Sequence, residues 1–180
     1  MITRIAKIVM SLALGLFCLL VAFDNVTDYT TNYLFVQHVM SMDTTYPDSE
    51  LRYRAITNPV LWQLAYAAII FGEAVTGAFF LMGAYRLWQA KEGSGAAFNR
   101  AKSTTIAASL LAFVVWFFGF MVVAGEWFAM WESEHWNFQE AAFRFYMTVL
   151  AVLIFVVMPD GDLDAAVRTR HTPKRRRTDK

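Results

Sequence analysis

The sequence is poor in the residues on which most catalytic and cofactor sites depend. One cysteine, Cys18, occurs in 180 residues, which excludes an intrachain disulfide and every CxxC motif. All three histidines, His38, His135 and His171, fall outside the long apolar runs, so a haem held by two histidines inside a bilayer is not expected. No glycine-rich phosphate loop and no HExxH motif is present. We therefore predict no catalytic residue and no cofactor, and we expect no enzymatic activity.

Charge is also scarce. Charged residues make up 17% of the chain, against roughly 25% in soluble domains, while hydrophobic residues make up 57%. One short globular core cannot bury that much apolar surface, so the composition predicts a chain that lies in the lipid bilayer.

The chain does contain long apolar runs. A membrane helix needs about 20 mainly apolar residues, and the segments at about 5–24, 60–87, 106–128 and 141–158 meet this requirement. The first could be a signal peptide, but the bulky Phe23 stands where cleavage requires a small residue. We therefore predict a domain of four retained transmembrane helices within residues 1–158.

The placement of basic residues predicts how these helices cross the membrane. Most of the 16 lysines and arginines lie at the N-terminus, in the connection 86–103 and after residue 159. The connections 24–58 and 126–140 are acidic by comparison. Because basic loops stay on the cytoplasmic side, we expect both termini in the cytoplasm.

The two acidic connections predict an ordered cap outside the membrane. Tyr29, Tyr33 and Val36 recur at helical spacing in residues 24–58. Residues 126–140 are rich in tryptophan, which favours the membrane interface. The predicted fold class is thus all-α, an integral membrane four-helix bundle with an ordered extracytoplasmic cap.

Residues 159–180 form a basic tail that we expect to be disordered and cytoplasmic. Its cluster consists of Lys174, Arg175, Arg176 and Arg177. Nucleic acid or anionic lipid could bind such a cluster. Beside a membrane helix the lipid interpretation is stronger, at roughly 1 kcal/mol per basic residue, so we expect the lipid bilayer as a partner and no nucleic acid.

Two blocks carry a family resemblance. They are NVTDYTTNYLFVQHVMSMDTTYP, residues 25–47, and AGEWFAMWESEHWNF, residues 124–138. These blocks resemble the signatures of a bacterial family of predicted small integral membrane proteins of unknown function. Where the family has a first glycine and a glutamine in the second block, this chain has Ala124 and Glu132. The resemblance implies a multi-pass protein of the bacterial inner membrane and transfers no activity.

Glu73 is the first candidate functional residue because it lies well inside the second apolar segment. An ionised carboxylate there costs from about 2.5 kcal/mol to far more. We expect a neutral carboxyl that donates a hydrogen bond, with Trp116 and Thr148 as neighbours at similar depth. The functional alternative is a proton or cation site.

Glu126 and Arg144 form the second candidate. They lie near the outer ends of the third and fourth segments, which a short connection joins. An ion pair between them would offset the desolvation of each charge. We predict a structural clasp here, with binding of an anionic group by Arg144 as the alternative.

A third candidate is a metal site on the cap, formed by His38, Met40, Met42 and His135. Imidazole and thioether ligands suit copper(I). Methionine is also a common gap filler in apolar surroundings, so packed side chains are the competing interpretation.

Three functions remain open at this stage. The first is a non-catalytic accessory or assembly subunit of a larger membrane complex. Partner membrane subunits or a second copy of the chain are the expected protein partners. The second is a small carrier or channel that uses Glu73 for a proton or cation, and the third is copper binding by the cap. The first is preferred because a single intramembrane carboxylate comes without a paired acid, base or ligand set.

Overall fold

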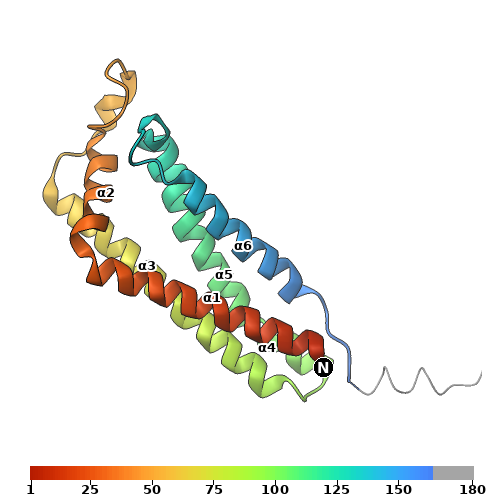
Figure 1. Cartoon of the computed structure of the whole chain (residues 1–180). Helices are drawn as coiled ribbons and strands as arrows, with labels where there is room; N and C mark the ends of the chain where they lie inside the picture. The colour runs from red at the N-terminus through yellow and green to blue at the C-terminus, as the bar shows by residue number, and fades with distance from the viewer. Residues whose placement is uncertain (164–180) are drawn as a thin grey trace, which may run out of the picture.

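The computed structural model describes residues 1–163 as a bundle of helices (Figure 1). The elements in chain order are α1 (Ile2–Thr27), α2 (Tyr29–Ser41), η1 (Glu50–Arg54), α3 (Pro59–Ala90), α4 (Gly95–Ala101), α5 (Ser103–Phe113), η2 (Val114–Trp127), η3 (Met130–Glu132) and α6 (Gln139–Val157). No strand occurs within residues 1–163. Four stretches, Ile2–Thr27, Pro59–Ala90, Gly95–Trp127 and Gln139–Val157, are long and apolar enough to cross a membrane. The predicted all-α membrane bundle is confirmed.

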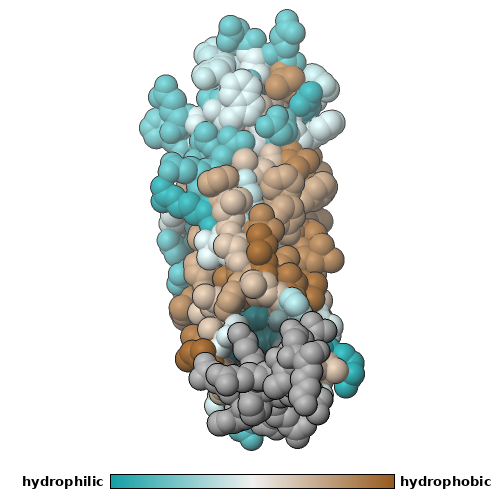
Figure 2. Space-filling view, turned by 90° about the vertical axis from the view of Figure 1, so that its right-hand side faces the viewer, coloured by the Kyte–Doolittle hydropathy of each residue, from teal (hydrophilic) through white to brown (hydrophobic). Residues whose placement is uncertain are grey.

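The N-terminus and the last described residues lie at the same end of the bundle, which we call the terminal end (Figure 1). The opposite end, the cap end, holds α2, η1 and η3. An apolar band separates the hydrophilic cap from the terminal end on the face shown in Figure 2. This distribution is the one that a bilayer imposes on a spanning protein.

Local sequence explains where the long α3 helix begins. The Asn58 side chain accepts a hydrogen bond from the backbone N–H of Val60 at 2.9 Å, and Pro59 occupies the first helical turn. A proline at this position loses no helical hydrogen bond and has its backbone angle already set. The helix therefore starts abruptly after the polar connection.

Two glycines allow α1 and α3 to pack closely along the centre of the bundle. A Cβ at Gly15 would lie 2.7 Å from the side chain of Leu81, and one at Gly77 would lie 2.8 Å from that of Leu19. Small residues at such crossings let membrane helices approach each other. The pair α1–α3 is thus held in one antiparallel register.

The third span changes its winding halfway along. Its first half contains α4 and α5, and residues Val114–Trp127, η2, form a π-helix. Such winding is rare and is usually confined to single turns, often at functional sites. Trp116 near the start of η2 is buried, with 2% of its surface exposed, and packs in the central core with Cys18 and Phe80.

The cap has a small core of its own. Val39, Met42, Phe128 and Met130 are buried together where α2 meets the end of η2. The buried carboxylate of Glu132 joins the two cap connections, because it accepts hydrogen bonds from the Tyr46 N–H and the Ser49 hydroxyl, each at 3.2 Å. The cap is therefore packed onto the spans rather than suspended above them.

Candidate functional site

The intramembrane polar site joins α1 to α3 on the cap side of the glycine crossing. The Nδ2 of Asn25 donates to Oε2 of Glu73 at 2.7 Å. The hydroxyl of Tyr66 donates to the backbone carbonyl of Asn25 at 2.6 Å. Glu73 is 2% exposed and Tyr66 is 1% exposed, so these bonds lie where water does not compete and each is worth more than at a surface.

This site opens into a hollow of about 190 Å³, the polar cavity, whose polar lining consists of Asn25, Asn32, Tyr66 and Glu73. Trp116 and Phe145 line the same cavity from η2 and α6. Oε1 of Glu73 has no hydrogen-bond partner within residues 1–163. One carboxylate oxygen is therefore available to a ligand, a proton or a water in the cavity.

A second hollow of about 340 Å³, the apolar cavity, lies between α2, α3 and η2. Met40, Ala68, Phe118 and Val123 are among its lining residues, and every lining side chain is apolar. The two cavities share Phe35, Val36, Ile69 and Phe120 as lining residues. They are therefore adjacent spaces that differ sharply in polarity.

A third hollow, of about 420 Å³, lies between α1 and α6, and we call it the α1–α6 seam. Met10, Ala13 and Phe17 line it from α1, and Thr148 and Val152 line it from α6. Apart from Thr148 and Arg144, its lining is apolar. The seam shows that α1 and α6 do not close completely against each other.

The structure brings together part of the predicted intramembrane site. Trp116 and Glu73 line one cavity, as described above. Thr148 instead lies in the α1–α6 seam, where its hydroxyl donates to the backbone carbonyl of Arg144 at 2.7 Å. Oε2 of Glu73 accepts a hydrogen bond from Asn25, and the neutral carboxyl that donates a hydrogen bond stays a prediction.

The predicted clasp between Glu126 and Arg144 is replaced by a different contact. Arg144 pairs with Glu140 one helical turn away on α6, and both side chains are largely exposed. Glu126 is exposed at the end of η2, where its backbone carbonyl accepts from Arg54 at 3.4 Å. Glu140 lies four residues before Arg144 on the same helix and is therefore the nearer partner. The third and fourth spans thus pack without the predicted ion pair between Glu126 and Arg144.

The residues proposed for copper lie in separate surroundings. Nδ1 of His38 is 2.9 Å from the carboxylate of Asp43, and its ring stacks on Trp136. Met42 is buried in the cap core, and Met40 lines the apolar cavity. His135 is exposed. Within residues 1–163 no group of three or more His, Cys, Asp or Glu side chains is arranged to hold a metal ion.

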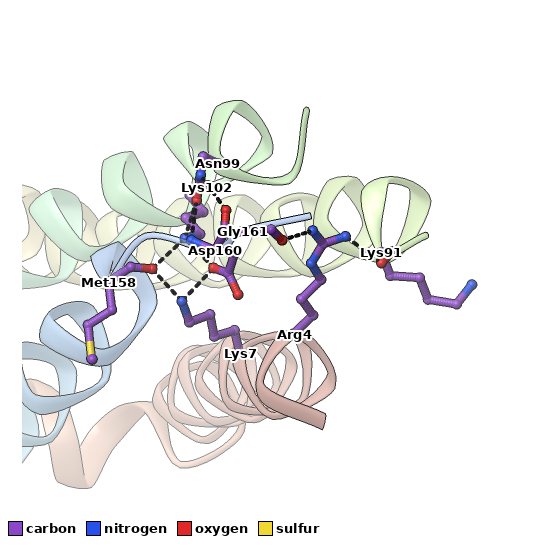
Figure 3. Close-up of polar contacts among 8 residues, drawn as sticks. All are labelled: Arg4, Lys7, Lys91, Asn99, Lys102, Met158, Asp160 and Gly161. Atoms are coloured by element: carbon purple, nitrogen blue, oxygen red, sulfur yellow. Dashed lines mark hydrogen bonds and ion pairs between the residues drawn. The ribbon is translucent and has the colours of Figure 1, made fainter. Parts of the chain in front are cut away.

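A second polar cluster closes the terminal end (Figure 3). The ammonium groups of Lys7 and Lys102 contact the same oxygen, Oδ2 of Asp160, at 2.6 and 2.5 Å. Both also donate to the carbonyl of Met158, and Lys102 donates to the side-chain oxygen of Asn99 at 2.7 Å. The cluster therefore joins α1, α4 and the segment after α6.

Arg4 extends the same clasp. Its guanidinium donates to the carbonyls of Lys91, Gly93 and Gly161 at 2.7 to 2.8 Å. Arg4, Lys7 and Lys102 are each no more than 2% exposed. Because each of these charged groups has internal acceptors, the cluster fastens helix ends together rather than presenting a binding site.

Burial raises the pKa of Asp160, but the hydrogen bonds and charges of Lys102 and Lys7 outweigh this effect and hold the pKa below the ordinary 3.8. Asp160 therefore stays ionised at every pH at which the cell operates. A carboxylate beside two ammonium groups is strongly stabilised in its charged form.

Sequence reasoning missed Asn25 and the terminal cluster. Asn25 was assigned to the cap, but α1 continues to Thr27 and carries it against α3. Lys7 was assigned no partner, and Asp160 was assigned to the tail. An antiparallel alignment of Gly15 against Leu81, as the structure has it, places Asn25 opposite residue 71 and so near Glu73, whereas no local signal pairs Lys7 with Asp160. The tail residues Lys174, Arg175, Arg176 and Arg177 lie outside the described residues.

Comparisons with known proteins agree with this architecture. A search of curated proteins and a search of solved structures found no match. A family model described as "Predicted small integral membrane protein (DUF2165)" matches residues 3–159, which include all four spans except Ile2. The chain therefore belongs to this family of small integral membrane proteins.

Proposed function

We propose that the protein acts as a non-catalytic accessory subunit of a larger assembly in the bacterial inner membrane. The observation that carries this proposal is the α1–α6 seam, an open hollow of about 420 Å³ between two spans. The lining residues Ala13 and Thr148 are exposed at its edge. A transmembrane helix of a partner would fill this seam and complete the packing that α1 and α6 leave open.

The limited packing of α6 supports the same proposal. Within its most apolar stretch 22% is buried inside the chain, the same share as in the third span and less than the 39% of α1. In lipid, helices associate through close packing and hydrogen bonds, since no hydrophobic force brings them together. A span with little internal packing is therefore suited to a contact with another subunit.

The hydrogen bonds of the buried polar groups favour a structural role for these groups over a catalytic one. The ammonium of Lys102 has three oxygen acceptors, and Asn25, Tyr66 and Glu73 are bonded to one another across two helices. Groups used in this way fix helix positions. The proposal accordingly assigns the function to the surface of the bundle, with no cofactor and no nucleic acid as a partner.

The proposal includes an orientation. The terminal end contains the basic residues Arg4, Lys7 and Lys102. By the positive-inside rule we assign this end to the cytoplasm. In this orientation the basic cluster of the tail would face the anionic inner leaflet, where each basic residue contributes about 1 kcal/mol.

Site-specific photocrosslinking tests the partner. A photoreactive residue at Ala13 in the seam should form a covalent adduct of one defined mass with another polypeptide in intact membranes. The same residue at Ala78, an alanine exposed on α3 and outside all three cavities, is the matched control and should give no such adduct. Equal adduct patterns at both positions, or an adduct only with a second copy of this chain, would count against an accessory role.

A proton or cation carrier is the second candidate, and one observation favours it: Oε1 of Glu73 is unpartnered within residues 1–163 and Glu73 lines the polar cavity. In liposomes, the carrier would conduct a proton or small cation, and Glu73→Gln would abolish the flux. Glu126→Gln, which removes the same charge from an exposed position, should leave it unchanged. Absence of flux in the wild-type protein would remove this candidate.

A further inference from the structure

The polar and apolar cavities lie side by side and differ in chemistry. Phe35, Val36, Ile69 and Phe120 line both. One, of about 340 Å³, has only apolar lining side chains, and the other, of about 190 Å³, contains a carboxylate, two amides and a phenol. A molecule with an apolar chain and a small polar head matches this division, and pockets of this size commonly hold small ligands.

The carboxylate at the polar end lacks a cation. Glu73 is 98% removed from solvent, as its 2% exposure shows, and no lysine or arginine of residues 1–163 forms an ion pair with it. Asn25 bonds to Oε2 and leaves Oε1 without a hydrogen-bond partner among residues 1–163, in a side chain that lines the cavity. A buried charge is costly unless a partner of opposite sign accompanies it, so a positively charged head would supply what the chain does not.

The surroundings of Glu73 suit an organic ammonium ion rather than a hydrated metal ion. Tyr66, Trp116, Phe138 and Phe145 line the polar cavity from three different helical elements and one connection. Aromatic faces attract cations that have little hydration, by about 0.5 to 2 kcal/mol each. A hard metal ion favours several charged oxygen ligands, and Glu73 is the one acidic side chain among the residues that line this cavity.

We infer that the two adjacent cavities together form a binding site for an amphiphilic organic ammonium ion. The ammonium head lies beside Glu73 and the aromatic side chains, and the apolar chain fills the space between α2, α3 and η2. The inference does not depend on the accessory role, because a subunit and a solitary protein could each carry such a site.

Access to the site is consistent with this ligand. Phe118 lines the apolar cavity and is 54% exposed on the face that meets lipid, so an apolar chain would enter sideways from the bilayer. Asp24 and Asp28 are exposed where α1 ends near the polar cavity. Their negative charge would attract a cation and repel an anion from the same entrance.

Isothermal titration in maltoside micelles tests the inference with defined probes. Decyltrimethylammonium carries the proposed charge, and decanol and decyl phosphate carry the same chain with no charge and with negative charge. The wild-type protein should bind the ammonium at least ten-fold more tightly than either analogue. Glu73→Gln should remove this preference, whereas Glu126→Gln, with the same loss of charge at an exposed site, should retain it.

A second variant tests the apolar half separately. Ala68→Trp would fill the apolar cavity and should weaken the binding of decyltrimethylammonium by at least ten-fold. The binding of ethyltrimethylammonium, which has the same head and almost no apolar chain, should be less affected. Equal affinity of the wild-type protein for decanol and decyltrimethylammonium would overturn the inference even if Glu73→Gln did not fold. Unchanged ammonium binding by a folded Glu73→Gln protein would overturn it as well.

Discussion

The side-chain amide of Asn25 lies 2.7 Å from the carboxylate of Glu73 and joins the last turns of α1 to the middle of α3. The two residues are 48 positions apart in the chain. Because Tyr66 bonds to the backbone of the same asparagine, three polar groups from two helices hold one another where the polar cavity begins. The stability of the bundle and the chemistry of the cavity thus depend on the same residues.

Asn25→Ala should reduce the stability of the bundle more than Glu73→Gln does. Asn25→Ala leaves Glu73 buried without its donor, and we expect the free energy of unfolding to fall by about 1–3 kcal/mol. Glu73→Gln keeps an oxygen that accepts from Asn25, so its loss should be below about 1 kcal/mol. Unfolding by denaturant in mixed micelles measures both. A greater loss for Glu73→Gln than for Asn25→Ala would show that the carboxylate, and not the hydrogen bond, stabilises the site.

The helix crossing at Gly15 should not accept a larger side chain. A Cβ there would lie 2.7 Å from the Leu81 side chain and 3.0 Å from the backbone nitrogen of Leu81, so Gly15→Ala should reduce the free energy of unfolding by about 1–3 kcal/mol. Gly119→Ala is the control, because its Cβ would meet its nearest neighbour at an ordinary 3.7 Å. Equal stability of the two variants would contradict the close α1–α3 packing.

Asp160 should contribute more to stability than any exposed acid. Asp160→Asn leaves Lys7 and Lys102 buried without a shared anion, and breaking a buried pair in this way costs about 3–5 kcal/mol. Asp162→Asn is the matched control, since Asp162 is exposed and its remaining amide oxygen can still accept from the N–H of Gly95. Comparable losses in the two variants would refute the clasp.

The same carboxylate gives the bundle a defined response to acid. Since the pKa of Asp160 is lower in the folded chain than the ordinary 3.8, its contribution is complete above that value and is lost as the pH falls through the folded pKa. Stability attributable to Asp160 should therefore be constant from pH 7 to about pH 5 and decrease only in stronger acid. The difference in the free energy of unfolding between wild type and Asp160→Asn, followed across this pH range, measures this contribution. A difference that disappears near neutral pH would contradict the assignment.

The sequence predicted those features that depend on composition and periodicity. The spans follow from apolar length, and the positions of Pro59 and Asn58 define where α3 begins. Burial of Lys7 could not be predicted, because a lysine near the end of a span has water within reach and its partner, Asp160, is more than 150 residues away. Glu126 and Arg144 were paired from their depth alone, whereas the nearer Glu140 takes the arginine.

The winding of η2 was equally beyond prediction. Residues Val114–Trp127 read as an ordinary apolar helix, and nothing in their composition distinguishes a π-helix from an α-helix. That winding determines which side chains line the cavities, including Trp116 and Phe120. The cavities, and with them the proposed ammonium site, therefore emerge only from the three-dimensional arrangement.

The proposed orientation predicts which connections face the outside. Cysteines in place of Asp48 in the cap connection and Glu134 near η3 should react with an impermeant thiol reagent in intact cells, because both positions are exposed. A cysteine in place of Ser94, exposed at the terminal end, should react only after the membrane is opened. The native Cys18 is fully buried and should not contribute. Labelling of position 94 alone would reverse the orientation.

Native mass spectrometry of the protein, extracted gently from its own membrane, tests the accessory role most directly. We predict a complex in which this chain is accompanied by a different polypeptide in fixed ratio. Ala13→Trp, which fills the α1–α6 seam, should release that polypeptide, whereas Ala78→Trp on the exposed face of α3 should retain it. A bare monomer or a homo-oligomer in the wild-type preparation would contradict the account and would shift the function to the cavities around Glu73.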